Sequence, residues 1–130
     1  MPNQGVNTVN VIKLTSGTTV GADGSASNRV TTPDIVNGKI VGIHVTYQSG
    51  TPATTTIAIG DSTGTGSQNI LTLANKTDNG WFYPQLLPCN TSGTLLGTNI
   101  ITSPFVNSPI TMTVTSVNSA STYTIRILYT

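Results

Sequence analysis

Hydrophobic and polar residues alternate in several segments of this chain, and this period of two limits its fold more than any other feature. The alternation is clearest in residues 39–47, 110–115 and 123–129. Successive side chains of a strand point to opposite faces of a sheet, so each segment is expected to form a half-buried strand. In 39–47 we predict one face with Val41, Ile43, Val45 and Tyr47, and the other with Ile40, Gly42, His44 and Thr46.

Weaker signals of the same kind extend the pattern over most of the chain. Val, Ile, Thr and Tyr dominate these stretches and favour strands, because branched and aromatic side chains fit a pleated surface. Glu is absent and Ala, Lys and Arg are scarce, which leaves little material for helices. We expect residues 118–121 to form a hairpin loop between the last two strands. Further strands are expected at 6–14 (with a bulge), 26–32, 54–59 (with Ile57 and Ile59 pointing inward), 70–74 and 81–84.

Roughly seven to nine short strands, with turns about every ten residues, are typical of a sandwich or a barrel. We predict an all-β, single-domain β-sandwich with a jelly-roll-like arrangement. An immunoglobulin-like sandwich is the alternative, because strand spacing alone does not reveal which strands pair. The chain of 130 residues fits one domain, 1–130, in which residues 1–5 could form a flexible arm.

Charged residues make up only 7% of the chain, and the net charge is +1. This balance provides no basic surface for nucleic acid, so no nucleic-acid partner is predicted. Weak mutual repulsion favours association into an assembly. No apolar run approaches the roughly 20 residues that span a bilayer, and the N-terminus lacks the pattern of a signal peptide. We therefore expect no membrane partner and synthesis in a cytoplasm.

Residues for catalysis or metal binding are few. His44 is the sole histidine and Cys89 the sole cysteine, which excludes a zinc site in practice and an intrachain disulfide. The segment 60–62, Gly-Asp-Ser, is similar to the start of an esterase signature, but the later Asp-x-x-His pair is missing. The four aspartates all fall in predicted turns. We predict no enzyme, no metal and no cofactor, and we interpret His44 as a surface or interface residue.

The aromatic run at 81–83 is the most conspicuous candidate for binding. Alternation sends Trp81 and Tyr83 to one side of the strand and Phe82 to the other. One side is expected to join the core and the other to form an interface. Stacking on nucleic-acid bases would require basic residues beside the rings, and Lys76 is the only one nearby in the sequence.

Three segments together resemble a family of small proteins encoded among the head genes of tailed bacteriophages. They are 38–47, 70–84 and 103–110, and the most distinctive part is the run Trp-Phe-Tyr-Pro at 81–84. Relatives often carry Arg and acidic residues after that proline, whereas Gln85-Leu86-Leu87-Pro88-Cys89 is apolar here. A drier interface would replace whatever those charges contact elsewhere.

Members of that family are capsid decoration, or cement, proteins. The resemblance implies a jelly-roll-like fold, assembled as a homotrimer on the outside of the head, with the major capsid protein as partner. The expected location is thus the exterior of the capsid in the virion. Candidate interface residues are Trp81, Phe82, Tyr83, Pro84, Phe105 and Val6 of the N-terminal arm.

Two alternatives stay open. The chain could be a fibre, spike or tail-associated domain of the same particle. It could also be a carbohydrate-binding module that uses Trp81 and Tyr83 on an exposed face. A glycan-binding module is expected to expose these rings in a groove, whereas a decoration protein is expected to present a flat surface.

Overall fold

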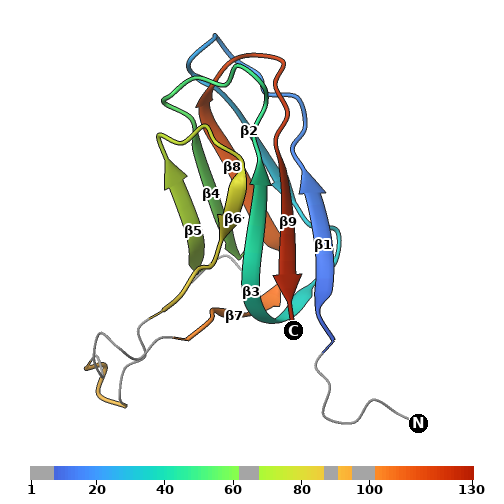
Figure 1. The fold of residues 1–130 in the computed structure, drawn as a ribbon, viewed down its shortest axis with the longest axis vertical. Helices are drawn as coiled ribbons and strands as arrows, with labels where there is room; N and C mark the ends of the chain where they lie inside the picture. The colour runs from blue at the N-terminus through green and yellow to red at the C-terminus, as the bar shows by residue number, and fades with distance from the viewer. Residues whose placement is uncertain (1–7, 62–67, 87–90, 95–101) are drawn as a thin grey trace.

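The computed structural model describes residues 8–61, 68–86, 91–94 and 102–130, and within these ranges it contains nine strands and no helix (Figure 1). The strands are β1 (Asn10–Thr15), β2 (Ala26–Thr31), β3 (Val36–Thr46), β4 (Thr56–Asp61), β5 (Asn69–Ala74), β6 (Gly80–Phe82), β7 (Phe105–Ser108), β8 (Ile110–Val117) and β9 (Thr124–Tyr129). The all-β class predicted from the alternation is confirmed.

The strands form two antiparallel sheets that pack face to face. One sheet has the order β1-β9-β3-β6, with β7 pairing the first part of β3, and the other has the order β2-β8-β4-β5. Figure 1 shows β6, β3, β9 and β1 in front of β4, β8 and β2. The fold is therefore a β-sandwich, as predicted.

The pairing of strands decides between the two predicted topologies. β1 pairs with β9, β2 with β8, β3 with β6 and β4 with β5, so each pair is nested inside the one before it. A long two-stranded ribbon that is folded over in this way is a jelly roll. An immunoglobulin-like sandwich would pair several consecutive strands. Among the described strands, only β4 and β5 are consecutive and paired.

The predicted hairpin at 118–121 is wrong. β8 pairs with β2 and β4, whereas β9 pairs with β1 and β3. The connection between them therefore crosses from one sheet to the other. Two alternating strands joined by a short loop have the same local pattern whether they pair or face each other, so the sequence did not distinguish these cases.

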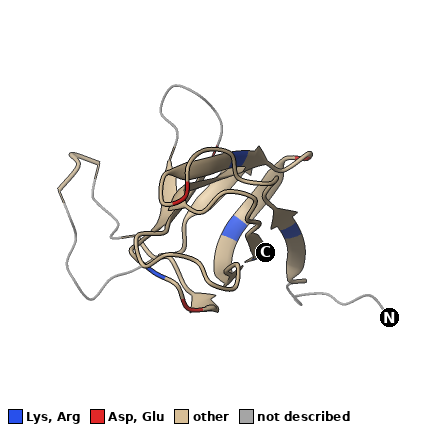
Figure 2. Ribbon diagram, turned by 90° about the horizontal axis from the view of Figure 1, so that it is seen from above, with Lys and Arg blue, Asp and Glu red and all other residues tan. Residues whose placement is uncertain are grey.

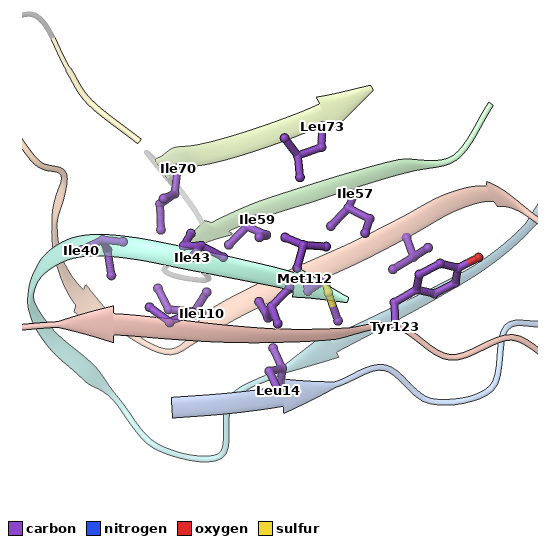
Figure 3. Close-up of a cluster of buried hydrophobic side chains, with 14 of the residues drawn as sticks. Leu14, Ile40, Ile43, Ile57, Ile59, Ile70, Leu73, Ile110, Met112 and Tyr123 are labelled. Carbon is purple, nitrogen blue, oxygen red and sulfur yellow. The ribbon is translucent and has the colours of Figure 1, made fainter. Parts of the chain in front are cut away.

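The core lies between the sheets and receives side chains from both (Figure 3). Alternate residues of β4 and β8, Met112 among them, point inward, as predicted for Ile57 and Ile59. Full burial of such a side chain contributes roughly 1.5–3 kcal/mol to stability. The largest side chains with less than 2% exposure are Tyr123, Ile40, Ile43, Ile57, Ile59, Ile110, Met112, Ile125, Ile127, Val36, Val45 and Val106.

The predicted faces of β3 are correct for its second half and wrong for its first. Ile43 and Val45 are fully buried, but so is Ile40, while Val41 is partly exposed. The register with β9 shifts between Ile40 and Gly42. One extra residue in a strand reverses the side-chain alternation, and here it turns Ile40 inward. By contrast, β1 pairs with β9 without a register shift, so the bulge predicted in 6–14 is absent from its described strand.

β7 was not predicted from the sequence. Proline stands on both sides of it, at 104 and 109, which obscures a strand of four residues. Its partner Gly38 has φ +149°, and a Cβ there would overlap the carbonyl oxygen of Thr130. Glycine therefore allows β3, β7 and the end of the chain to meet closely.

Candidate functional site

The outer side of the β1-β9-β3-β6 sheet carries a row of basic and aromatic side chains. Arg126 of β9 lies opposite Lys13 of β1 and opposite His44 of β3. His44 in turn lies opposite Trp81 of β6. Residues directly opposite one another project from the same face of a sheet. The four residues therefore form one line across the sheet, which we call the basic row.

An apolar row runs beside the basic row. Leu128 lies opposite both Val11 and Gly42. Gly42 has no side chain, and aromatic rings cover it: a Cβ there would lie 3.2 Å from Cε1 of Tyr83 and 3.7 Å from Cε3 of Trp81. Because Gly42 leaves this space, the two rings lie close to the sheet and next to each other.

Lys39 and Phe105 extend the same side of the sheet toward β7. They lie opposite each other, and the ring of Phe105 is 59% exposed. We call the outer surface formed by the basic row, the apolar row and this pair the β1–β6 face. Its members are Lys13, Arg126, His44, Trp81, Val11, Leu128, Gly42, Tyr83, Lys39 and Phe105.

The β1–β6 face has a positive charge and no acidic residue of its own. The described ranges include every Lys, Arg, Asp and His of the chain. Three of the five Lys and Arg residues and the sole histidine lie on this face. Asp61 ends β4 in the other sheet, and the remaining three aspartates lie in connections. Figure 2 shows basic residues mainly within strands and acidic ones at strand ends and in loops, and Lys76 lies in the connection before β6.

The aromatic run has the alternation that the sequence predicted. Trp81 and Tyr83 point outward with exposures of 46% and 62%. Phe82 lies opposite Ile43 and packs against the core. Pro84 is buried. Of the predicted interface residues, Trp81, Tyr83 and Phe105 thus share one exposed surface, and Val6 lies outside the described residues.

The basic part of this surface was missed from the sequence. Lys76 was considered the only basic residue near the rings, because it is the only one nearby along the chain. Pairing of β3 with both β6 and β9 instead brings Arg126 into line with Trp81. The two residues are 45 positions apart in the sequence. Only the strand order, which alternation does not reveal, could have placed them together.

The outer side of the other sheet is different in character. Its outward-facing positions are rich in threonine and include Thr56, Thr72 and Thr113. Arg29 of β2, opposite Thr113, is the only Lys or Arg in its strands. A cleft of about 250 Å³ lies here, lined by Arg29, Ala58, Ile59, Gly60, Asp61, Gln68, Asn69, Thr111 and Thr113.

A second cleft of about 380 Å³ lies between two connections, one after β3 and one before β6. Tyr47 lines it together with residues 48–51 and 77–79. Burial, followed by the nearby charge of Asp78 and by Tyr123, raises the pKa of Tyr47 to about 12. Its buried hydroxyl has no hydrogen-bond partner among the described residues. Neither cleft includes Trp81, Tyr83 or Phe105.

Other kinds of site find no support within the described ranges. No three His, Cys, Asp or Glu residues there lie close enough to hold a metal ion. No helix in that part of the chain is long and apolar enough to cross a membrane. Cys89 lies outside the described residues.

Comparison with known proteins identifies no relative: no family model, no curated protein and no solved structure matches this chain. The fold and its surface define the molecule as a jelly-roll domain with an aromatic and basic sheet face.

Proposed function

We propose that this protein is a structural component of a tailed-phage particle. In this proposal it is a decoration protein that binds the outside of the head as a homo-oligomer, a trimer, and stabilises the shell. The resemblance of segments 38–47, 70–84 and 103–110 to head-associated proteins indicates the kind of particle. The jelly-roll topology agrees with the fold that this resemblance implies.

The observation that carries the proposal is the exposure of three aromatic rings on one sheet face. Trp81, Tyr83 and Phe105 are 46%, 62% and 59% exposed, and they lie outside both clefts. Exposed apolar surface of this kind marks a site of interaction with another macromolecule. Tryptophan and tyrosine are among the residues that contribute most to protein interfaces.

The composition also supports a protein that functions in an assembly. Polar residues are mostly uncharged, with charged residues at 7%. Such a surface is buried at lower desolvation cost than one rich in Lys and Glu. A protein that binds the assembled shell and not its separated subunits stabilises the shell by mass action.

A carbohydrate-binding module is the second candidate, because Trp81 and Tyr83 are neighbouring exposed rings. Sugar sites are usually concave, and these two rings line neither of the clefts described above.

A fibre or tail domain differs from a decoration protein only in its place of attachment. Purified tails are therefore the right comparison for that alternative.

Sedimentation with capsids tests the proposal. The mass of the purified protein is first measured by light scattering, and the protein is then added to heads that were assembled without it. We expect an oligomer that pellets with heads, saturates at a fixed ratio to the shell and raises the temperature at which heads disrupt. Binding to tails and not to heads would show that the protein is a tail-associated domain. If the protein binds neither heads nor tails but binds glycans on an array, and this binding requires Trp81, the protein is a carbohydrate-binding module and the proposal is wrong.

A further inference from the structure

We propose that the β1–β6 face is the surface that docks on the shell, and that the surface it meets is acidic. This inference rests on the proposed function and adds the contact face and the chemistry of the partner. It follows from an uneven charge distribution in a chain whose net charge is only +1.

The charge distribution gives the molecule one positive side. The β1–β6 face carries Lys13, Lys39 and Arg126 and no aspartate. The rest of the chain holds only two basic side chains and all four aspartates. Complementary potentials orient two proteins as they approach, so the positive face would meet a negative surface first.

The same charges argue against pairing of this face with itself. A symmetric dimer through the β1–β6 face would bring Arg126 and Lys13 of one copy toward the same residues of the other. Like charges placed together across an interface cost several kcal/mol. The occupant of the face is therefore a different, acidic protein surface rather than a second copy in a two-fold arrangement.

The arrangement of the rings favours a protein partner over single-stranded nucleic acid. Binding of a strand uses a basic groove along which bases stack on successive rings. Here the rings of Trp81 and His44 pack edge to face, and the ring of Tyr83 lies against the backbone of Gly42. Val11 and Leu128 occupy the row beside them. Aromatic anchors beside aliphatic groups, with Arg126 at the centre, match the composition of a protein interface.

Among the charged residues of the β1–β6 face, Arg126 is expected to contribute most to binding. It lies on the strand between β1 and β3, with Lys13 opposite on one side and His44 on the other. Central arginines in interfaces contribute more than charges at the rim. Its guanidinium can also form two parallel hydrogen bonds to a carboxylate.

The chain offers a matched control for this residue. Arg29 is also an exposed arginine in a strand, but it belongs to β2 in the opposite sheet. Arg126→Ser and Arg29→Ser change the net charge equally but alter opposite faces, and Arg29 also lines the smaller cleft. Circular dichroism and thermal unfolding of both variants establish that they fold.

The experiment measures the affinity of each variant for heads assembled without this protein. We expect Arg126→Ser and Trp81→Ala each to weaken binding about tenfold or more, and Arg29→Ser to change it less than about twofold. Arg126→Lys should recover part of the affinity, because it keeps the charge. Rising salt should weaken wild-type binding more steeply than binding of Arg126→Ser.

Failure of the inference and failure of the proposed function give different results. If wild type binds heads and Arg29→Ser loses binding while Arg126→Ser does not, the protein decorates heads through its other face. If Arg126→Ser instead lowers the mass measured by light scattering, the β1–β6 face joins copies of the chain. If wild type binds a single-stranded oligonucleotide in place of heads, the partner is a nucleic acid, and both proposals are overturned.

Discussion

His44 and Trp81 contact each other edge to face on the outer side of the sheet, with ring centroids 5.0 Å apart and ring planes at 63°. The imidazole ring thus packs beside the indole, while Gly42 leaves room for Tyr83. Both exposed rings are thus held against the sheet, so a partner would meet them with little loss of side-chain freedom on binding.

The fit of the rings over Gly42 can be tested with a single methyl group. In Gly42→Ala the new Cβ would lie 3.2 Å from the ring of Tyr83, so the ring must move. At Gly80 the nearest atoms would be 3.9 Å away, in Phe82. We expect Gly42→Ala to be about 1 kcal/mol less stable in urea than Gly80→Ala, and to bind heads more weakly. Equal stability and equal binding of the two variants would show that the rings do not depend on Gly42.

The bulge in β3 predicts unequal effects at neighbouring positions. Ile40 is fully buried and Val41 is partly exposed, the reverse of what alternation alone predicts. Ile40→Ala should lower the free energy of unfolding by about 2–5 kcal/mol, whereas Val41→Ala should lower it by less than about 1 kcal/mol. Urea denaturation measures both values. A larger loss in Val41→Ala would place the bulge elsewhere in the strand.

A comparison of Tyr47 with Tyr123 tests how much a hydrogen bond of a buried tyrosine hydroxyl contributes to stability. Their rings pack edge to face with centroids 6.2 Å apart. The hydroxyl of Tyr123 lies 2.6 Å from Oγ1 of Thr51, whereas that of Tyr47 has no partner among the described residues. Tyr123→Phe should therefore cost about 1 kcal/mol, and Tyr47→Phe should be neutral or slightly stabilising. The reverse order in chemical denaturation would mean that the hydroxyl of Tyr47 is bonded.

The raised pKa of Tyr47 predicts loss of stability in alkaline solution. Burial favours the neutral phenol and moves the pKa of Tyr47 from 10.0 to about 12. The stability that this contributes is complete below pH 10 and is lost as the pH rises toward 12. We expect the free energy of unfolding to fall by about 1–2 kcal/mol from this group across that range.

Tyr47→Phe provides the control for this effect. The variant should lose less stability than wild type between pH 10 and 12, and its absorbance titration should lack the tyrosinate that forms near pH 12. Identical pH profiles of wild type and variant would assign the alkaline loss to other groups.

Much of the fold follows from alternation alone. Ile57 and Ile59 were expected inward and are fully buried, and Trp81 and Phe82 were expected on opposite sides and are. What alternation does not contain is the order of strands. The nested pairing that distinguishes a jelly roll from an immunoglobulin-like sandwich joins β1 to β9, two segments at opposite ends of the chain.

The candidate site, like the fold, could be predicted from the sequence only in part. Its aromatic part is continuous in the sequence and was identified there. Its basic part is assembled by pairing from β1, β3 and β9, so Lys13 and Arg126 carried no local signal. The bulge at Val41 was also hidden, because the sequence Ile-Val-Gly-Ile at 40–43 allows either face to be buried until β9 sets the register.

An electron cryo-microscopy map of heads saturated with this protein tests the central claim most directly. The account predicts additional jelly-roll density on the outside of the shell, with the β1–β6 face turned toward it and Arg126 next to an acidic patch. A saturated head without such density would contradict the proposed function. Density in which the threonine-rich face around Thr113 meets the shell would contradict the docking face.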